Sequence, residues 1–249
     1  MVVHPHANAF DNAADEYERG RPGYPAALLD WINALRPLDG SSTIVDLGAG
    51  TGKLTRLLVG SPARVIAVEP LPAMRETFAR VLPGTELIDA TAQSMPLEDA
   101  SVDIVACGQS FRWFATEAAL AEIARVLRPG GELLLIFNGN GEASPVQRRL
   151  SELLQVADTE TTEKKPGLDW REVLAATERF RIIEEVEISN PHFVSREGVV
   201  DRLRSSSQFS RLAPARQEEL LSDIGGLIEG DLADLSQVTR VTALRRLGD

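Results

Sequence analysis

The chain of 249 residues is long enough to bury a sizeable core in one large domain. Its hydrophobic fraction of 43% and charged fraction of 25% are those of an ordinary globular protein. The formal net charge of −11 disfavours a nucleic-acid partner, because an acidic protein repels a phosphate backbone.

The N-terminal residues 10–25 carry polar and aromatic side chains without a strand pattern, and three turn-forming residues break the segment near its end. A helix is predicted over residues 25–35, because apolar residues recur there at helical spacing. The pair Arg36-Pro37 ends it, since a residue before proline disfavours helical geometry.

Between residues 40 and 140, short apolar runs alternate with helical segments. This alternation is typical of parallel βαβ units whose sheet is covered on both faces. The predicted strands are 43–47, 64–68, 85–89, 102–107 and 132–137, the last entered through a tight turn at 128–131; the predicted helices are 53–59, 72–81 and 116–127.

Beyond residue 137 the pattern loosens. Helices are predicted at 145–156, 169–177, 199–203 and 214–228, and strands at 181–188 and 236–244. We therefore predict a single α/β domain with a Rossmann-like, mostly parallel sheet flanked by helices. It consists of an N-terminal helical lid (1–39), a ligand-binding core (40–140), a C-terminal helical insertion forming a partial cap (141–234) and a final strand (235–249).

The most informative segment is IVDLGAGTG at residues 44–52. An apolar strand containing Asp46 runs into a glycine-rich turn, and a helix follows. Glycines allow a tight turn and let a ligand approach without Cβ atoms in the way. The start of the helix offers free N–H groups to a carboxylate or phosphate.

Three ligands compete for such a turn. A dinucleotide site has the spacing G-x-G-x-x-G, whereas this turn reads G-x-G-x-G. A P-loop needs a glycine five residues before Gly52 and Ser or Thr at residue 54, and neither is present. S-adenosylmethionine fits without adjustment, because it has no pyrophosphate to be repelled by Asp46. That carboxylate can attract the ligand's ammonium group, directly or through water.

Glu69 follows the second predicted strand, 19 positions after Gly50. A carboxylate at this place can accept both hydroxyls of a ribose, as an acid does in enzymes that bind NAD. The spacing alone does not separate a nicotinamide cofactor from S-adenosylmethionine. Together with Asp46 it favours the methyl donor.

Several strings resemble a known family: VDLGAGTGKLT, VEP at 68–70, ATAQSMPLEDASVDIV at 90–105 and LRPGG at 127–131. The chain resembles the class I S-adenosylmethionine-dependent methyltransferases, in particular their small-molecule branch called type 11. YERGRPGYP near the start, GQSFRWF at 108–114 and RLRSSSQFSRL at 202–212 resemble the trans-aconitate methyltransferase-like group.

The resemblance implies S-adenosyl-L-methionine as cofactor and S-adenosyl-L-homocysteine as its product. The glycines would turn beneath the methionine part, Asp46 would hold its amino group, and Glu69 would take the ribose. Arg21 of the lid would pair with the methionine carboxylate, and Thr91 stands where many members have Asp. The implied cofactor residues are Tyr17, Arg21, Asp46, Gly48, Gly50, Glu69, Pro70, Leu71, Thr91, Ala92, Gln93 and Gln109.

One departure concerns the acceptor side. Related sequences commonly read His-Trp-Phe where this chain has Arg112-Trp113-Phe114. An arginine there could hold an acidic substrate group bidentately. The candidate substrate residues are Phe111, Arg112, Trp113 and Asn138, with at most one or two of the aromatic residues 111, 113 and 114 lining the pocket. The run at 202–204 is expected to be a solvated helix face, and His192 to be structural.

The predicted function is S-adenosylmethionine-dependent methylation of a small molecule, with an acidic or hydroxylated metabolite as the preferred acceptor and oxygen as the preferred atom, while N- and C-methylation stay open. A carboxylate acceptor needs no dedicated base, and no catalytic residue is assigned. The alternatives are a non-enzymatic S-adenosylmethionine-binding protein and a nicotinamide-dependent oxidoreductase. An RNA methyltransferase is disfavoured by the acidic charge.

The sequence also bears on location. The single cysteine, Cys107, excludes an internal disulfide and fits a reducing compartment. Residues 1–10 lack the pattern of a signal peptide, and the longest strongly apolar stretch, 133–137, is too short to span a bilayer. We expect a cytoplasmic protein without a membrane partner, and no metal site at His4 and His6 in the N-terminal residues.

Overall fold

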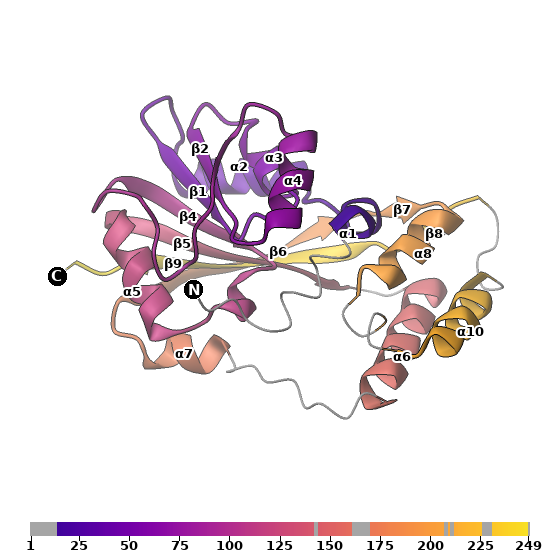
Figure 1. Cartoon of the computed structure of the whole chain (residues 1–249). Helices are drawn as coiled ribbons and strands as arrows, with labels where there is room; N and C mark the ends of the chain where they lie inside the picture. Colours follow the sequence, from indigo (N-terminus) through magenta and orange to yellow (C-terminus); the bar gives the residue numbers. More distant parts are fainter. Residues whose placement is uncertain are drawn as a thin grey trace.

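A computed structural model describes residues 14–141, 144–160, 170–206, 209, 212–225 and 231–248. A seven-stranded sheet forms its centre, with the strand order β3-β2-β1-β4-β5-β9-β6 (Figure 1). Strands β1 to β5 pair in parallel, whereas β9 runs antiparallel to both of its neighbours. The sheet is therefore mostly parallel, as predicted. Its strands are β1 (Thr43–Leu47), β2 (Arg64–Val68), β3 (Glu86–Ile88), β4 (Val102–Gly108), β5 (Leu127–Asn140), β6 (Phe180–Asn190) and β9 (Gln237–Arg246).

The central strands are buried on both faces, which explains their continuous apolar sequences. In the register of the sheet, Val45 of β1 lies beside Ile66 of β2 and Val105 of β4. Parallel pairing brings the carboxyl ends of these strands to one edge of the sheet. The glycine turn, Glu69 and Gln109 all follow these ends, so they meet at that edge.

Helices cover both faces. One apolar layer packs α2 (Ala26–Leu35) and α3 (Thr55–Leu58) against the sheet, and the other packs α5 (Glu117–Val126) and α7 (Trp170–Ala176). Helix α4 (Pro72–Val81) follows β2 and buries Met74 and Phe78. Helix α3 is shorter than predicted, because residues 51–54 form turns before it.

Helix α1 (Ala14–Gly20) lies in the segment predicted as a lid, between α4 and α8 (Arg196–Arg204) (Figure 1). A Cβ atom on Gly20 would lie 2.4 Å from the backbone nitrogen of Arg202, so the two helices touch through their backbones. This contact requires glycine at residue 20.

Part of the C-terminal half stands apart from the sheet. Helices α6 (Pro145–Glu160), α8 and α10 (Pro214–Gly225) gather with the short strands β7 (Phe193–Val194) and β8 (Ala233–Asp234) around their own apolar cluster (Figure 1). Strand β6 and helix α7 lie within the same stretch of sequence but join the main sheet and its cover. The described parts of the segment between β5 and β9 thus contribute both to this separate cluster and, through β6, to an edge of the main sheet.

One further local feature differs from the predictions, and one prediction falls outside the described residues. The predicted tight turn at 128–131 is a bulge in β5, where the pairing jumps from Val102↔Leu127 to Ile104↔Glu132 and Gly130 has φ +74°. Residues 226–228 of the last predicted helix lie outside the described residues. Within the described ranges, no helix combines the length and apolar character that crossing a membrane requires.

Candidate functional site

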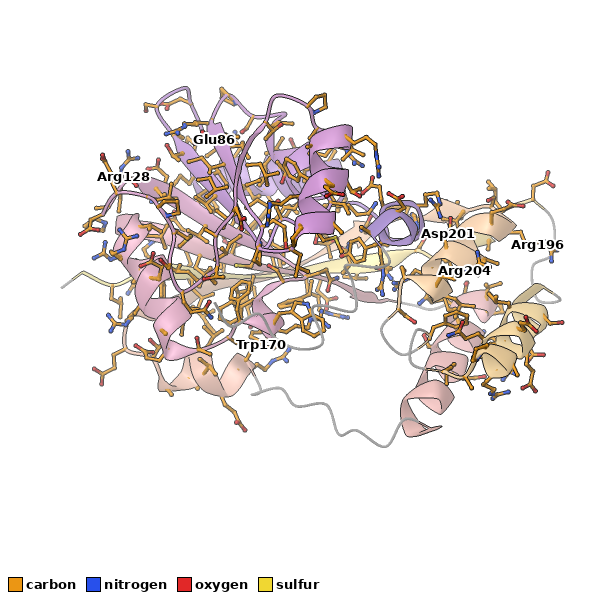
Figure 2. The ribbon with its side chains drawn as sticks, viewed as in Figure 1. Glu86, Arg128, Trp170, Arg196, Asp201 and Arg204 are labelled. Carbon is orange, nitrogen blue, oxygen red and sulfur yellow. The ribbon has the colours of Figure 1, made fainter. Side chains whose placement is uncertain are left out.

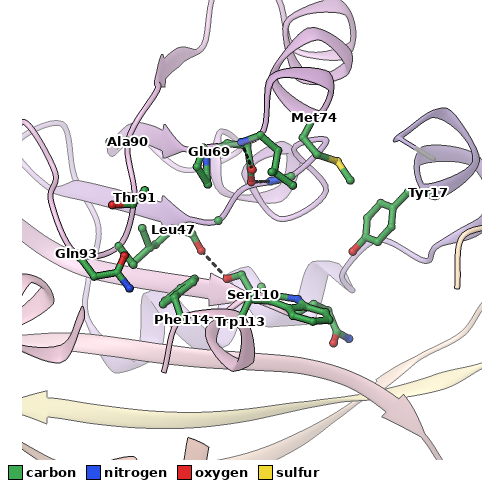
Figure 3. Close-up of a pocket in the computed structure, with 17 residues that line it drawn as sticks. Tyr17, Leu47, Glu69, Met74, Ala90, Thr91, Gln93, Ser110, Trp113 and Phe114 are labelled. Atoms are coloured by element: carbon green, nitrogen blue, oxygen red, sulfur yellow. Dashed lines mark hydrogen bonds between the residues drawn. The ribbon is translucent and has the colours of Figure 1, made fainter. Parts of the chain in front are cut away.

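A cavity opens at the edge where β1, β2 and β4 end (Figure 3). Counted together with its open mouth, the cavity encloses about 850 Å³ of space not filled by protein atoms. Its wall comes from the glycine turn, the segments that follow β2, β3 and β4, and Tyr17 of α1. Figure 3 shows Tyr17 across the cavity from Thr91 and Gln93.

The glycine turn has backbone angles that favour glycine. The φ angles are +72° at Gly48, +57° at Gly50 and +88° at Gly52, all in the left-handed region. A Cβ atom on Gly48 would lie 2.6 Å from Cβ of Ser110, whereas one on Gly50 would meet nothing within 4 Å. The backbone at Gly48 is therefore packed against protein, and the backbone at Gly50 faces open space that a ligand can enter.

Glu69 is held by backbone groups from two sides. Its Oε2 accepts a hydrogen bond from the Gly50 N–H (2.8 Å), and its Oε1 accepts one from the Leu71 N–H (2.9 Å) (Figure 3). The side chain is only 5% exposed, yet it lines the cavity. Since a carboxylate oxygen can accept more than one hydrogen bond, Glu69 keeps capacity for the hydroxyls of a ligand.

Asp46 lies behind the lining and is fully buried. Its Oδ2 accepts a hydrogen bond from Thr55 Oγ1 (2.6 Å), whereas its Oδ1 has no hydrogen-bond partner among the residues that the structure describes. Burial raises the pKa of this carboxyl to about 7, and the negative charge of Glu69 adds to the increase. A buried acceptor without a partner is costly, so Oδ1 marks a place where a ligand donor or a water would be stabilising.

Helix α1 is fastened to the glycine turn through Glu18. The carboxylate accepts a hydrogen bond from Thr51 Oγ1 (2.6 Å) and pairs with Arg56 (2.7 Å), and the Glu18 carbonyl accepts from Lys53 Nζ (2.7 Å). Burial raises the pKa of Glu18, but the hydrogen bonds from Thr51 and Arg56 and the charge of Lys53 together hold it below its usual value. These contacts hold Tyr17 at the cavity.

The structure brings most of the predicted residues together. Leu47, Met74, Ala90, Gly108 and Ser110 also line the cavity and were not predicted. Gly108 and Ser110 flank the predicted Gln109, so they could have been inferred; Met74 projects from α4, and no sequence signal marks it. The predicted residues that line the cavity are Tyr17, Gly48, Gly50, Glu69, Pro70, Leu71, Thr91, Ala92, Gln93, Gln109 and Trp113, and Phe114 lines it too.

Five predicted residues do not line it: Arg21, Asp46, Phe111, Arg112 and Asn138. Phe111 is fully buried and contacts Phe114 edge-on, with 5.7 Å between ring centroids, so its place in the core corrects the prediction of a substrate contact. Asn138 donates to the Gly23 carbonyl (3.0 Å) and accepts from Thr239, so it joins the N-terminal segment to the sheet.

The two arginines stand one layer behind the lining. Arg112 Nη2 donates to Gln109 Oε1 (2.5 Å), and its guanidinium lies 5.2 Å from the ring centroid of Phe137. Arg21 lies 5.5 Å from the ring centroid of Tyr17 and donates two hydrogen bonds of 3.0 Å to Ser205. Each arginine therefore contacts a side chain that lines the cavity, without lining the cavity itself.

Comparison with known proteins identifies the class. A family model described as a methyltransferase domain matches residues 45–135. A methyltransferase of Mycobacterium bovis, itself uncharacterized, is 35% identical over 199 residues, which are 80% of this chain and 76% of that protein. The chain belongs to the methyltransferase family, as the motifs predicted.

Other relatives match over shorter stretches. An uncharacterized methyltransferase of Schizosaccharomyces pombe is 43% identical over 147 residues, and the chain spans only 59% of its length. A malonyl-[acyl-carrier protein] O-methyltransferase of Methylococcus capsulatus is 35% identical over 46% of its length, and a trans-aconitate 2-methyltransferase of an Azoarcus species is 36% identical over 40% of its length.

The fold is shared with solved structures. A methyltransferase structure from Anaeromyxobacter dehalogenans superposes with a TM-score of 0.72 over 92% of this chain and 99% of that one, at 21% sequence identity. The Rossmann-like methyltransferase fold, mostly parallel with helices on both faces, is thereby confirmed.

Proposed function

We propose that the protein transfers a methyl group from S-adenosylmethionine to a small acceptor molecule. The observation that carries this proposal is the carboxylate of Glu69, which the Gly50 N–H holds at the cavity. A pre-oriented acid beside a glycine turn suits a ribose with two free hydroxyls and a ligand without a phosphate in the turn.

The residues present fit this cofactor. The unpartnered Oδ1 of Asp46 suits the amino group of the methionine part, reached through a water because Asp46 lies behind the lining. The open space at Gly50 leaves room for the methionine part to approach the backbone. Ala92 and Gln93 offer an edge for adenine. Arg21, predicted as the partner of the methionine carboxylate, donates to Ser205 and does not line the cavity, so we assign it no cofactor contact.

The sulfonium of the cofactor supplies an already activated methyl group. The tasks left to this chain are to align the acceptor with that group and to exclude water. Tyr17, Gln109 and Trp113 line the cavity from α1 and from the segment after β4. Ala92 and Gln93 line it from the segment after β3. No base is needed if the acceptor atom is a carboxylate oxygen.

An acidic or hydroxylated acceptor is favoured by Arg112 beside the cavity and by the names of two relatives, which act on a malonyl group and on trans-aconitate. We therefore propose O-methylation. The alternatives are an S-adenosylmethionine-binding protein without enzymatic activity and a nicotinamide-dependent oxidoreductase, whose third motif glycine is missing.

The test is a methyl-transfer assay with radiolabelled S-adenosylmethionine over a panel of small acids, phenols and amines. We expect turnover with at least one acid and none with the amines. Cofactor binding without turnover of any class would support the non-enzymatic alternative instead. Binding of NADH, detected by its fluorescence, would support the oxidoreductase.

A further inference from the structure

Arg202 of helix α8 is less exposed to solvent than the sequence predicts. The run 202–204 was expected to be a solvated helix face, but Leu203 is fully buried and Arg202 is half-buried, while Arg204 is exposed. The cause is helix α1, whose Gly20 lies against the backbone of Arg202. Figure 2 shows Asp201 on the part of α8 that faces α1.

Arg202 has no acidic partner. Its neighbour Asp201 is taken by Arg19, whose Nε lies 2.7 Å from Asp201 Oδ2. Across the described part of the chain, no hydrogen bond or ion pair reaches the Arg202 guanidinium. Burial lowers the pKa of Arg202 well below its ordinary value, and the positive charge of Arg21 lowers it further.

Two more arginines point to the same region. Arg21 donates to Ser205, the residue that directly follows α8, and the charge of Arg112 acts on Arg21. Burial is again the first cause of the lowered pKa at Arg21 and at Arg112. None of the three has an ion pair with a carboxylate among the described residues, although the chain contains 37 acidic residues.

This cluster adjoins the cavity through its lining. Arg21 lies over the ring of Tyr17, and Arg112 is bonded to Gln109; both Tyr17 and Gln109 line the cavity. Arg21 repels the charge of Arg202 on one side and is repelled by the charge of Arg112 on the other. Partly buried guanidinium groups that repel one another and lose hydration destabilise the fold. An anion placed among them would remove that cost.

We propose that Arg202 is a specificity-determining residue of the acceptor site, where it binds, with Arg21 and Arg112, an anionic group of the methyl acceptor. The group is a carboxylate or a phosphate, which guanidinium recognises through paired hydrogen bonds. The inference rests on the proposed function, and it adds that the partial cap supplies part of the acceptor's recognition through α8.

The experiment titrates the protein by calorimetry with succinate, with inorganic phosphate and with succinamide, a neutral analogue of succinate. Each titration is run without and with saturating S-adenosylhomocysteine. We compare the wild type with Arg202→Gln and with Arg204→Gln, a matched control on the exposed side of the same helix. The succinate and phosphate arms distinguish the two anionic groups.

We expect the wild type and Arg204→Gln to bind succinate or phosphate and not succinamide. Arg202→Gln should weaken anion binding by about tenfold or more, the effect of losing a charged hydrogen-bonding partner. Its affinity for S-adenosylhomocysteine should stay that of the wild type. Its Tm without anion should not fall, because the substitution removes an unpaired, half-buried charge.

The proposal is overturned if the wild type binds neither anion, or if Arg202→Gln binds them as the wild type does. A lower Tm of Arg202→Gln would assign Arg202 a structural role instead. These outcomes leave the proposed function standing as long as S-adenosylhomocysteine binds. Conversely, failure of S-adenosylhomocysteine to bind would contradict the proposed function, while the anion titrations still decide the role of Arg202.

Discussion

At the scale of single residues, Asp46 lies on β1 and Glu69 directly follows the neighbouring strand β2, and their carboxylates have different surroundings. Glu69 accepts two backbone N–H groups and keeps contact with the cavity. Asp46 accepts one hydroxyl and is otherwise buried, which raises its pKa to about 7. Asp46 therefore titrates near neutral pH.

This difference predicts a pH dependence of stability. The native state keeps the proton of Asp46 up to about pH 7, whereas the unfolded chain loses it near pH 3.8. Native protein thus binds more protons between these values, so this carboxyl stabilises the fold at low pH and its contribution is lost as pH rises. Between pH 5 and pH 8 the loss should be about 2–3 kcal/mol.

The measurement is urea unfolding of the wild type and Asp46→Asn at several pH values from 5 to 8. The variant should become more stable relative to the wild type as pH rises, because it carries no titrating group at this position. The quantity that tests the prediction is the difference between the two proteins in the slope of unfolding free energy against pH. The other titrating residues act equally on both proteins and cancel in this difference. Parallel pH profiles of the two proteins would contradict the account.

Single residues also show where sequence reasoning succeeds and where it ends. Gly48, Gly50 and Glu69 could be placed because their roles follow from the order strand, turn, helix within one stretch of chain. Phe111 and Arg202 could not, because their burial depends on segments far away in the sequence: Trp170 packs against Phe111, and Gly20 against Arg202.

At the scale of elements, helix α1 is joined to the glycine turn and to the helix after it through contacts with residues 51–56. Glu18 makes three of these contacts, with Thr51, Lys53 and Arg56. Replacement of Glu18 should therefore loosen helix α1, which carries Tyr17. We expect it to leave the central sheet intact, because Glu18 makes these contacts outside the sheet.

We predict that Glu18→Ala weakens the binding of S-adenosylhomocysteine by about three- to tenfold and speeds hydrogen exchange in α1, with a change in Tm of only a few degrees. Calorimetry and hydrogen exchange measure the two effects. Glu86→Ala is the control, because it removes an exposed ion pair with Arg64 far from α1. Equal affinity and equal exchange in the two variants would refute a role of Glu18 in holding the helix.

The elements themselves were largely predictable from periodicity. Strands β1, β2 and β4 stand out because both of their faces are buried, so almost every residue is apolar. The order of the strands across the sheet could not be predicted from periodicity. Strand β9, the last in the chain, inserts between β5 and β6, and this choice depends on long-range pairing that leaves no local mark.

At the scale of the whole molecule, the charge is unevenly distributed. The chain has a formal net charge of −11, yet among the described residues no carboxylate pairs with Arg21, Arg112 or Arg202, which lie at α1, in the segment after β4 and at α8. The fold combines a sheet whose edge builds much of the cavity wall with a helical cluster that lies beside α1. We propose that this arrangement separates acceptor choice from cofactor binding.

The measurement that tests the central claim most directly is a calorimetric titration with S-adenosylmethionine and S-adenosylhomocysteine. We predict that the wild type binds both at micromolar to millimolar concentrations, and that Glu69→Ala binds them about 10- to 100-fold more weakly through loss of the ribose contact. Glu76→Ala, an exposed acid on α4, should bind like the wild type. Absence of binding in the wild type, or equal binding by Glu69→Ala, would contradict the account.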